Sequence, residues 1–150
     1  MTKIKIIAIG SLSPKFKSIF DDYAKKIKFF CDFSITEIKE ISEEKNIDIK
    51  IKKETALILN HIDSSQQVIL TSLRGNLYNS FEFANLLNKL QNRNIVIIIG
   101  GSNGVDESKF KNSIKISFSN LTFPHQLFRV MLAEQIYRGY SILNNNKYHK

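Results

Sequence analysis

The stretch Ile95-Val96-Ile97-Ile98-Ile99-Gly100-Gly101-Ser102-Asn103-Gly104 decides the fold of this 150-residue chain. Its five consecutive β-branched aliphatic residues predict a strand buried on both faces, and the glycines after them predict a turn at its carboxyl end. Ligands bind beyond the carboxyl ends of parallel strands, where main-chain N–H groups and helix N-termini converge. We therefore expect a functional site at this turn, where glycines let a ligand approach the main chain closely.

Further strands and helices alternate on both sides of this central strand. Apolar patterning predicts strands at residues 3–9, 33–38, 67–73, 95–99 and 115–118. Helical spacing predicts helices at residues 14–27, 48–62, 80–91 and 124–143, with a short helix near 106–112. Ser13 and Ser80 are the expected helix caps, and residues 39–46 are too polar to be buried. The alternation predicts one α/β domain over residues 1–150, with a mostly parallel sheet of five or six strands flanked by helices.

The last predicted helix differs from the others because its first half is apolar nearly all round. Such a helix must be buried on more than one side. We expect the sheet on one side of it and a second copy of the chain on the other, which predicts a homodimer.

Composition and the N-terminal residues indicate where the protein is located and what it binds. Cys31 is the only cysteine, so no internal disulfide can form, and Met1-Thr2-Lys3 leads directly into a strand pattern with no signal peptide or membrane span before it. These features predict a cytoplasmic protein without a membrane partner. The net charge of +8 makes nucleic acid the first candidate partner, although a codon bias toward lysine could produce the same charge.

Two short motifs suggest chemistry from the residues alone. Residues 100–104 satisfy the G-x-S-x-G pattern of serine hydrolases, with Ser102 as nucleophile and His125 or His149 as base. The pattern has only three fixed positions, and the chain is short for such an enzyme. Dinucleotide and P-loop motifs are absent, and the histidines and Cys31 have no metal-ligand spacing, so we expect no metal.

Three motifs in order resemble a known family. The strand end IIIGGSNG, the segment ISFSNLTFPHQLFRVMLAEQIYRGYSI and the terminal YHK are similar to the ribosomal RNA large subunit methyltransferase H family, a small SPOUT-class group. The resemblance covers essentially the whole chain. It implies a C-terminal trefoil knot, and methylation of N3 of a pseudouridine in a 23S rRNA hairpin on the assembled ribosome. It further implies S-adenosylmethionine as cofactor and a homodimer as the active form.

The resemblance also assigns residues to roles. It places the cofactor contacts at Thr71, Gly100, Phe118, Ser119, Asn120, Leu121, Thr122 and Phe123. His149 becomes the candidate for proton handling, Tyr148 a contact to the target base, and Arg129 a phosphate ligand or anion stabiliser. The chain departs from the family at Ser72, where an acid is common, and at Asn76, where a lysine is common. An inactive ribosome-binding module is the other alternative to an active enzyme.

Overall fold

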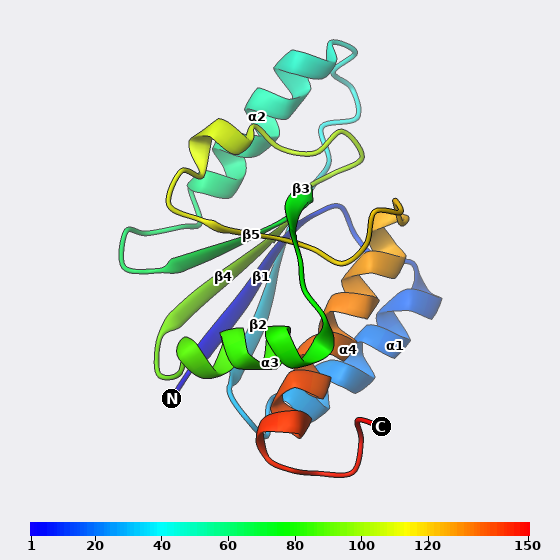
Figure 1. Ribbon diagram of the computed structural model, residues 1–150. Helices are drawn as coiled ribbons and strands as arrows, with labels where there is room; N and C mark the ends of the chain where they lie inside the picture. Colours follow the sequence, from blue (N-terminus) through cyan, green and yellow to red (C-terminus); the bar gives the residue numbers. More distant parts are fainter.

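The computed structural model describes residues 1–150 and contains five parallel strands in the order β2-β1-β4-β3-β5 (Figure 1). The strands are β1 (Lys3–Ile9), β2 (Asp32–Ile38), β3 (Gln67–Leu77), β4 (Asn94–Ile99) and β5 (Ile114–Ser117). The helices are α1 (Pro14–Ile27), α2 (Ile47–Leu59), α3 (Ser80–Lys89) and α4 (His125–Leu143), with a 3-10 turn η1 (Glu107–Lys109). The predicted α/β class and the five strands are confirmed.

Strand β4 is central to the sheet, between β1 and β3. Its residues Ile95–Ile99 are at most 3% exposed. This burial confirms the interpretation of the unbroken apolar run as a strand covered on both faces.

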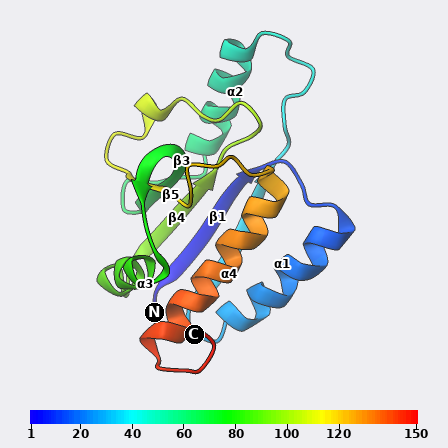
Figure 2. The ribbon, with the colours of Figure 1, turned by 45° about the vertical axis from the view of Figure 1, so that its right-hand side comes forward.

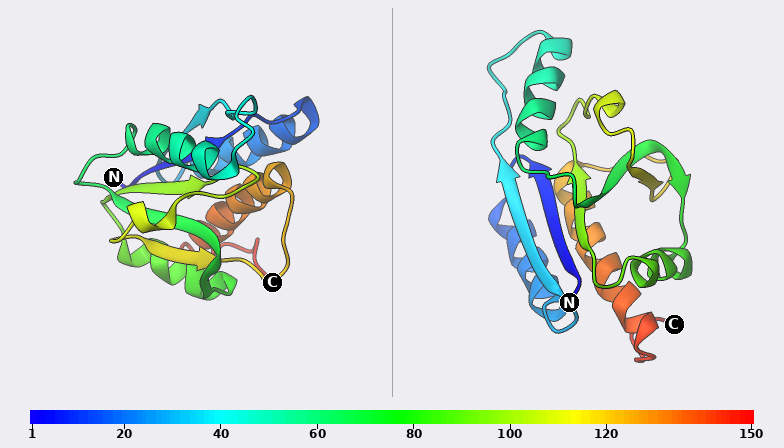
Figure 3. Two further views of the ribbon diagram at one scale, coloured as in Figure 1. Left: turned by 90° about the horizontal axis from the view of Figure 1, so that it is seen from above. Right: turned by 90° about the vertical axis from the view of Figure 1, so that its left-hand side faces the viewer.

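The two faces of the sheet carry unequal cores. Helices α1, α4 and α3 lie side by side over one face, where 21 buried residues form a single cluster (Figure 2). Helix α2 covers the other face, where the cluster has only 8 buried residues, Ile58 of α2 among them (Figure 3). The α2 side is therefore the thinner layer of the molecule.

Helix α4 lies between α1 and α3 and packs against both. The sheet and these two helices bury most of its apolar residues within one chain, while Leu127 in its first half is 38% exposed. The homodimer and the trefoil knot stay predictions. No helix is long and apolar enough to span a membrane.

Strand β3 is longer and less regular than predicted. Its pairing with β5 shifts register between Thr71 and Asn76, so the intervening residues leave the ladder before the strand resumes and ends at Leu77. Gly75 lets β3 approach β5 closely at this point, because a Cβ at that position would lie 2.6 Å from the carbonyl carbon of Ile116. The predicted end of the strand at residue 73 was therefore too early.

Several local predictions need correction. Asn79, and not Ser80, caps α3, because its side chain accepts from the Glu82 N–H while the Glu82 side chain accepts from the Asn79 N–H. Ser13 occupies the cap position of α1, but its side chain makes no capping hydrogen bond. The short helix predicted over residues 106–112 is reduced to the single turn η1.

Candidate functional site

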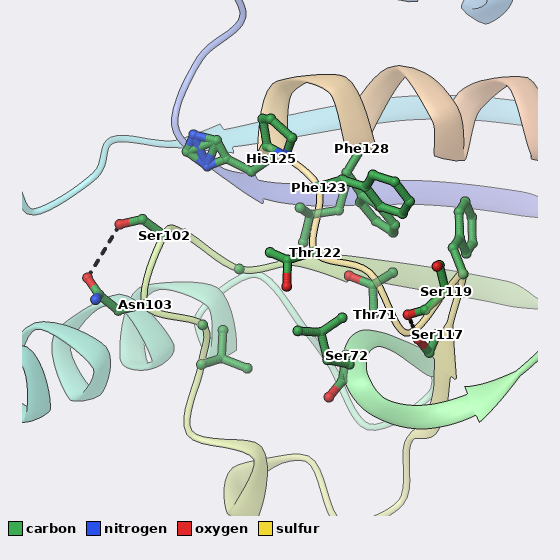
Figure 4. Close-up of a pocket in the computed structure, with 18 of the residues that line it drawn as sticks. Thr71, Ser72, Ser102, Asn103, Ser117, Ser119, Thr122, Phe123, His125 and Phe128 are labelled. Carbon is green, nitrogen blue, oxygen red and sulfur yellow. Dashed lines mark hydrogen bonds between the residues drawn. The ribbon is translucent and has the colours of Figure 1, made fainter.

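A cavity of about 1000 Å³ opens at the carboxyl ends of β4 and β5, beside the middle of β3 (Figure 4). Four segments line most of it: residues 71–74 at the register shift within β3, residues 99–105 at and after the end of β4, residues 116–119 at and after the end of β5, and residues 121–126 leading into α4. The turn after the central strand thus lies where parallel-strand geometry predicts a ligand site.

Most residues assigned to the cofactor lie together in this cavity. Its lining includes Thr71, Gly100, Phe118, Ser119, Leu121, Thr122 and Phe123, and leaves out Asn120. Residues 119–123 form no backbone–backbone hydrogen bonds, so their main-chain groups are available to a ligand, apart from the Ser119 C=O and the Leu121 N–H, which side chains bind.

Local side-chain bonds shape the walls of the cavity. Thr71 Oγ1 donates to the carbonyl oxygen of Ile98 at 2.7 Å, which ties the end of β3 to β4. Ser117 Oγ donates to the carbonyl oxygen of Ser119 at 2.9 Å, and Ser119 Oγ accepts from the Leu121 N–H at 3.0 Å. These bonds bend the main chain after β5 and leave the rest of its polar groups free.

Two aromatic side chains in the lining were missed from the sequence. Phe128 of α4 packs against Phe118 with ring centroids 4.8 Å apart, and Phe16 of α1 also lines the cavity. Helical spacing assigned both to the core, and it gave no signal that this end of the core is open. Gln126 Oε1 accepts from the Ser13 N–H at 2.7 Å, which joins the starts of α4 and α1 beside the cavity.

An ionic cluster forms the rim at Ser72. Glu107 accepts from Ser72 Oγ at 2.8 Å and from Arg74 Nη2 at 2.8 Å, and Lys115 Nζ lies 3.4 Å from its other oxygen. Burial raises the pKa of Glu107, but hydrogen bonds from Arg74 and Ser72 outweigh it and leave the pKa below its ordinary value. A carboxylate therefore lies at the rim although residue 72 is a serine.

Ser102 does not have the surroundings of a hydrolase nucleophile. Its Oγ donates to Glu40 Oε1 at 3.1 Å and to Asn103 Oδ1 at 3.4 Å, and no histidine is among its hydrogen-bond partners. A serine nucleophile needs a base within hydrogen-bond reach. The geometry thus gives the hydrolase hypothesis no support.

Arg129 is buried and lies outside the cavity lining, with only 3% of the side chain exposed. It donates to the Glu37 carboxylate and to the carbonyl oxygen of Gly10, the latter at 3.0 Å. Its guanidinium therefore joins α4 to the ends of β1 and β2.

Tyr148 and His149 lie at the opposite end of α4 from the cavity. His149 Nδ1 is 2.9 Å from Arg138 Nη1, and the Tyr148 ring stacks edge-on against Tyr137. Burial raises the pKa of Tyr148 to about 12, so its phenol is neutral at physiological pH. Tyr137 and Arg138 lie about 20 Å along α4 from its first residue, His125, so the structure does not bring these two side chains to the cavity of their own chain.

Comparison with known proteins decides the family. A family model described as "Predicted SPOUT methyltransferase" matches residues 2–149. The chain belongs to the SPOUT methyltransferase family. The family membership inferred from the three motifs is confirmed, and a SPOUT methyltransferase uses a methyl donor.

Relatives match this SPOUT chain over its full length. It is 56% identical over 150 residues to "Ribosomal RNA large subunit methyltransferase H" of Mycoplasmopsis agalactiae, with 100% of both chains covered. It is 42% identical to the protein of that name from Caldicellulosiruptor saccharolyticus, covering 98% of this chain and 99% of the relative. A solved structure titled as a probable methylase family protein from Haemophilus influenzae shares the fold with TM-score 0.57 at 13% identity, over 99% of this chain and 70% of that one.

Proposed function

We propose that this protein transfers a methyl group from S-adenosylmethionine to N3 of a pseudouridine in a 23S rRNA hairpin, on the assembled ribosome and as a homodimer. The observation that carries the proposal is the cavity, which gathers seven of the eight residues that the motifs assign to the cofactor. The names of the full-length relatives support rRNA as the substrate class. A ribosomal substrate places the activity in the cytoplasm.

The residues of the cavity fit the proposed cofactor. Phe118, Leu121 and Phe123 supply apolar walls for an adenine, and the main-chain groups of residues 119–123 that have no partner supply donors and acceptors for its edge. Recognition by main chain needs the shape of the segment more than particular side chains. Such a site tolerates the variation at Ser72 and Asn76.

Bound S-adenosylmethionine would supply an electrophilic methyl group on its sulfonium. The chain must then align the target nitrogen with that methyl, and alignment alone can contribute about 7 kcal/mol or more to lowering the barrier. The nitrogen carries a proton that must leave, and His149 is the proposed acceptor. The neutral phenol of Tyr148 can stack on the base or hydrogen-bond to it.

A second copy of the chain completes this arrangement. The tail of each chain packs beside Tyr137 and Arg138, about 20 Å along α4 from its own cavity. In a dimer with the two α4 helices running in opposite directions, the tail of one copy reaches the cavity of the other. Lysines on the surface would then hold rRNA phosphates, with binding that weakens as salt rises.

Methyl transfer from labelled S-adenosylmethionine to ribosomes from a strain without this gene tests the whole proposal. Mass mapping should find the label on N3 of a pseudouridine in the large-subunit rRNA. Label on another nucleotide would contradict the proposed target. Cofactor binding without any label would favour the inactive ribosome-binding module.

A mixing experiment tests the shared site. One variant lacks residues 148–150, and the other carries Thr122→Trp, which fills the cavity from an exposed position. Each should be inactive alone, while their mixture should regain activity because a mixed dimer holds one intact cavity beside one intact tail. A mixture that stays inactive although both variants are folded and dimeric would contradict the shared site.

A further inference from the structure

The buried face of α2 is mainly polar, unlike the buried faces of the other long helices. Lys50, Glu54 and Thr55 are three of its four buried residues, and Ile58 is the fourth. Their spacing places them on one side of the helix, facing the sheet layer. Because burying a lysine and a glutamate is costly unless they are paired, these residue types indicate a specific task on the inner side of α2.

The task is visible in their contacts with residues 100–106, which we call the glycine loop. Lys50 Nζ donates to Asn103 Oδ1 at 3.1 Å and to Glu40 Oε1 at 3.0 Å. One turn further along α2, Thr55 Oγ1 accepts from the Asp106 N–H at 3.0 Å. Helix α2 therefore holds the glycine loop near its middle and at its end (Figure 1).

Glu54 supports the start of the same loop from below. Its carboxyl is fully buried, and Oε2 accepts from the Ile41 N–H at 2.9 Å. Oε1 has no hydrogen-bond partner and faces Gly101 so closely that a Cβ on Gly101 would come within 3.2 Å of it. The buried Glu54 carboxyl therefore limits how closely the main chain of the loop can approach α2 at Gly101.

The glycine loop has little internal support of its own. Within it, the Gly104 N–H donates to the carbonyl oxygen of Gly101 at 3.0 Å, and those two residues form an isolated bridge. Its three glycines give the unsupported main chain wide conformational freedom. External contacts that remove this freedom before a ligand binds raise affinity, because less ordering is left for the binding step.

We propose that Lys50, Glu54 and Thr55 form a polar platform on α2 that holds the glycine loop in the shape of the cofactor cavity wall. They are positioning residues for the methyl donor and touch neither the donor nor the RNA. The inference rests on the proposed function, since it takes the ligand of the cavity to be S-adenosylmethionine. It assigns a role to a helix that contributes no residue to the cavity lining.

Calorimetric titration with S-adenosylmethionine and steady-state kinetics test the platform. Lys50→Met removes the ammonium group and keeps most of the apolar stem, and Lys50→Arg restores a donor to Asn103. Lys50→Met should raise both the Kd and the KM for S-adenosylmethionine about tenfold, equivalent to about 1.4 kcal/mol, and Lys50→Arg should recover most of the loss. The KM for ribosomes and the kcat at saturating donor should change little. Lys25→Met, at an exposed position of α1 without a side-chain hydrogen bond, is the matched control and should bind S-adenosylmethionine as the wild type does.

Thr55→Val and Glu54→Gln extend the test. Thr55→Val removes only the hydroxyl that accepts from Asp106, so it decides the question where Lys50→Met fails to fold. Glu54→Gln keeps an acceptor for the Ile41 N–H and should weaken donor binding through the Gly101 side alone. Folded variants that bind S-adenosylmethionine as the wild type does would overturn the platform. A folded wild type that does not bind this donor would instead overturn the proposed function.

Discussion

Gly75→Ala is expected to destabilise the protein by pushing β3 away from β5. A Cβ at Gly75 would lie 2.6 Å from the Ile116 carbonyl carbon and 2.7 Å from both the Ile116 nitrogen and the Lys115 carbonyl carbon. All three atoms belong to main chain inside a strand, so no rotamer change can relieve the contact. Gly75 does not have a positive φ, which leaves steric overlap as the only penalty.

The magnitude follows from two opposing effects. Overpacking of this kind costs about 3 kcal/mol, at the upper end of the usual range because backbone must move. Alanine also restricts the unfolded chain, which offsets about 0.4–1 kcal/mol. The free energy of unfolding should therefore fall by about 2 kcal/mol.

Urea unfolding followed by far-ultraviolet circular dichroism measures this loss, and calorimetry measures the accompanying change in donor binding. Because β5 leads directly into the cavity wall at Phe118, the displaced strand should also weaken binding of S-adenosylmethionine. Asn76→Ala is the matched control, since Asn76 is exposed and its side chain makes no hydrogen bond. A Gly75→Ala protein as stable as the control would refute the close approach of the two strands.

Three further perturbations test other parts of the structure. Glu107→Gln should lower the free energy of unfolding at pH 7 but not in acid. A carboxyl with a lowered folded-state pKa stabilises the fold above its unfolded pKa of about 4.3 and stops doing so as pH falls through the folded value. Urea unfolding should show a smaller difference from the wild type at pH 3 than at pH 7, while exposed Glu43→Gln should show no difference at either pH. Arg129→Met should lower the free energy of unfolding by about 3 kcal/mol or less, since Glu37, with 44% of its side chain exposed, can regain water; unchanged stability with weaker ribosome binding would instead make Arg129 a phosphate ligand. Burial raises the pKa of the Cys31 thiol to about 11, so iodoacetamide at pH 8 should label it only on unfolding, and fast labelling of the native protein would contradict its burial.

The sequence predicted those elements whose apolar pattern is either unbroken or follows one regular spacing. The run at Ile95–Ile99 has no polar interruption, and only a strand covered on both faces accounts for it. The four main helices likewise follow from 3.6-residue spacing. The spatial order of the strands was not predictable in this way, because it depends on contacts between segments far apart in the chain.

The polar side of α2 shows where pattern reasoning fails. In the sequence alone, Lys50 and Glu54 look like solvated residues of a lysine-rich helix. Their partners Asn103 and Gly101 lie about fifty residues away in the chain, so no local spacing could indicate the contact. The cap of α3 was missed for a simpler reason, since Asn79 and Ser80 are both good caps and only Glu82 three residues after Asn79 distinguishes them.

The candidate site was also only partly predictable from the sequence. Glycines after a buried strand pointed to the cavity, and motif order supplied the segment after β5. The position of the tail could not be inferred, because His149 is held by Arg138 and Phe81, which belong to different helices.

Helix α4 acts as a rigid spacer between a chain's cavity and its own tail, so methylation activity depends on how much of the protein the cell contains. Under the proposed dimer, a lone chain can still bind its donor but cannot complete a reaction. Below the dimer dissociation constant, activity should fall with the square of protein concentration while donor occupancy per chain stays constant. Gene dosage would then control modification more steeply than it controls expression, and a copy with neither a tail nor an open cavity, made beside the intact protein, would inhibit it by occupying its partners.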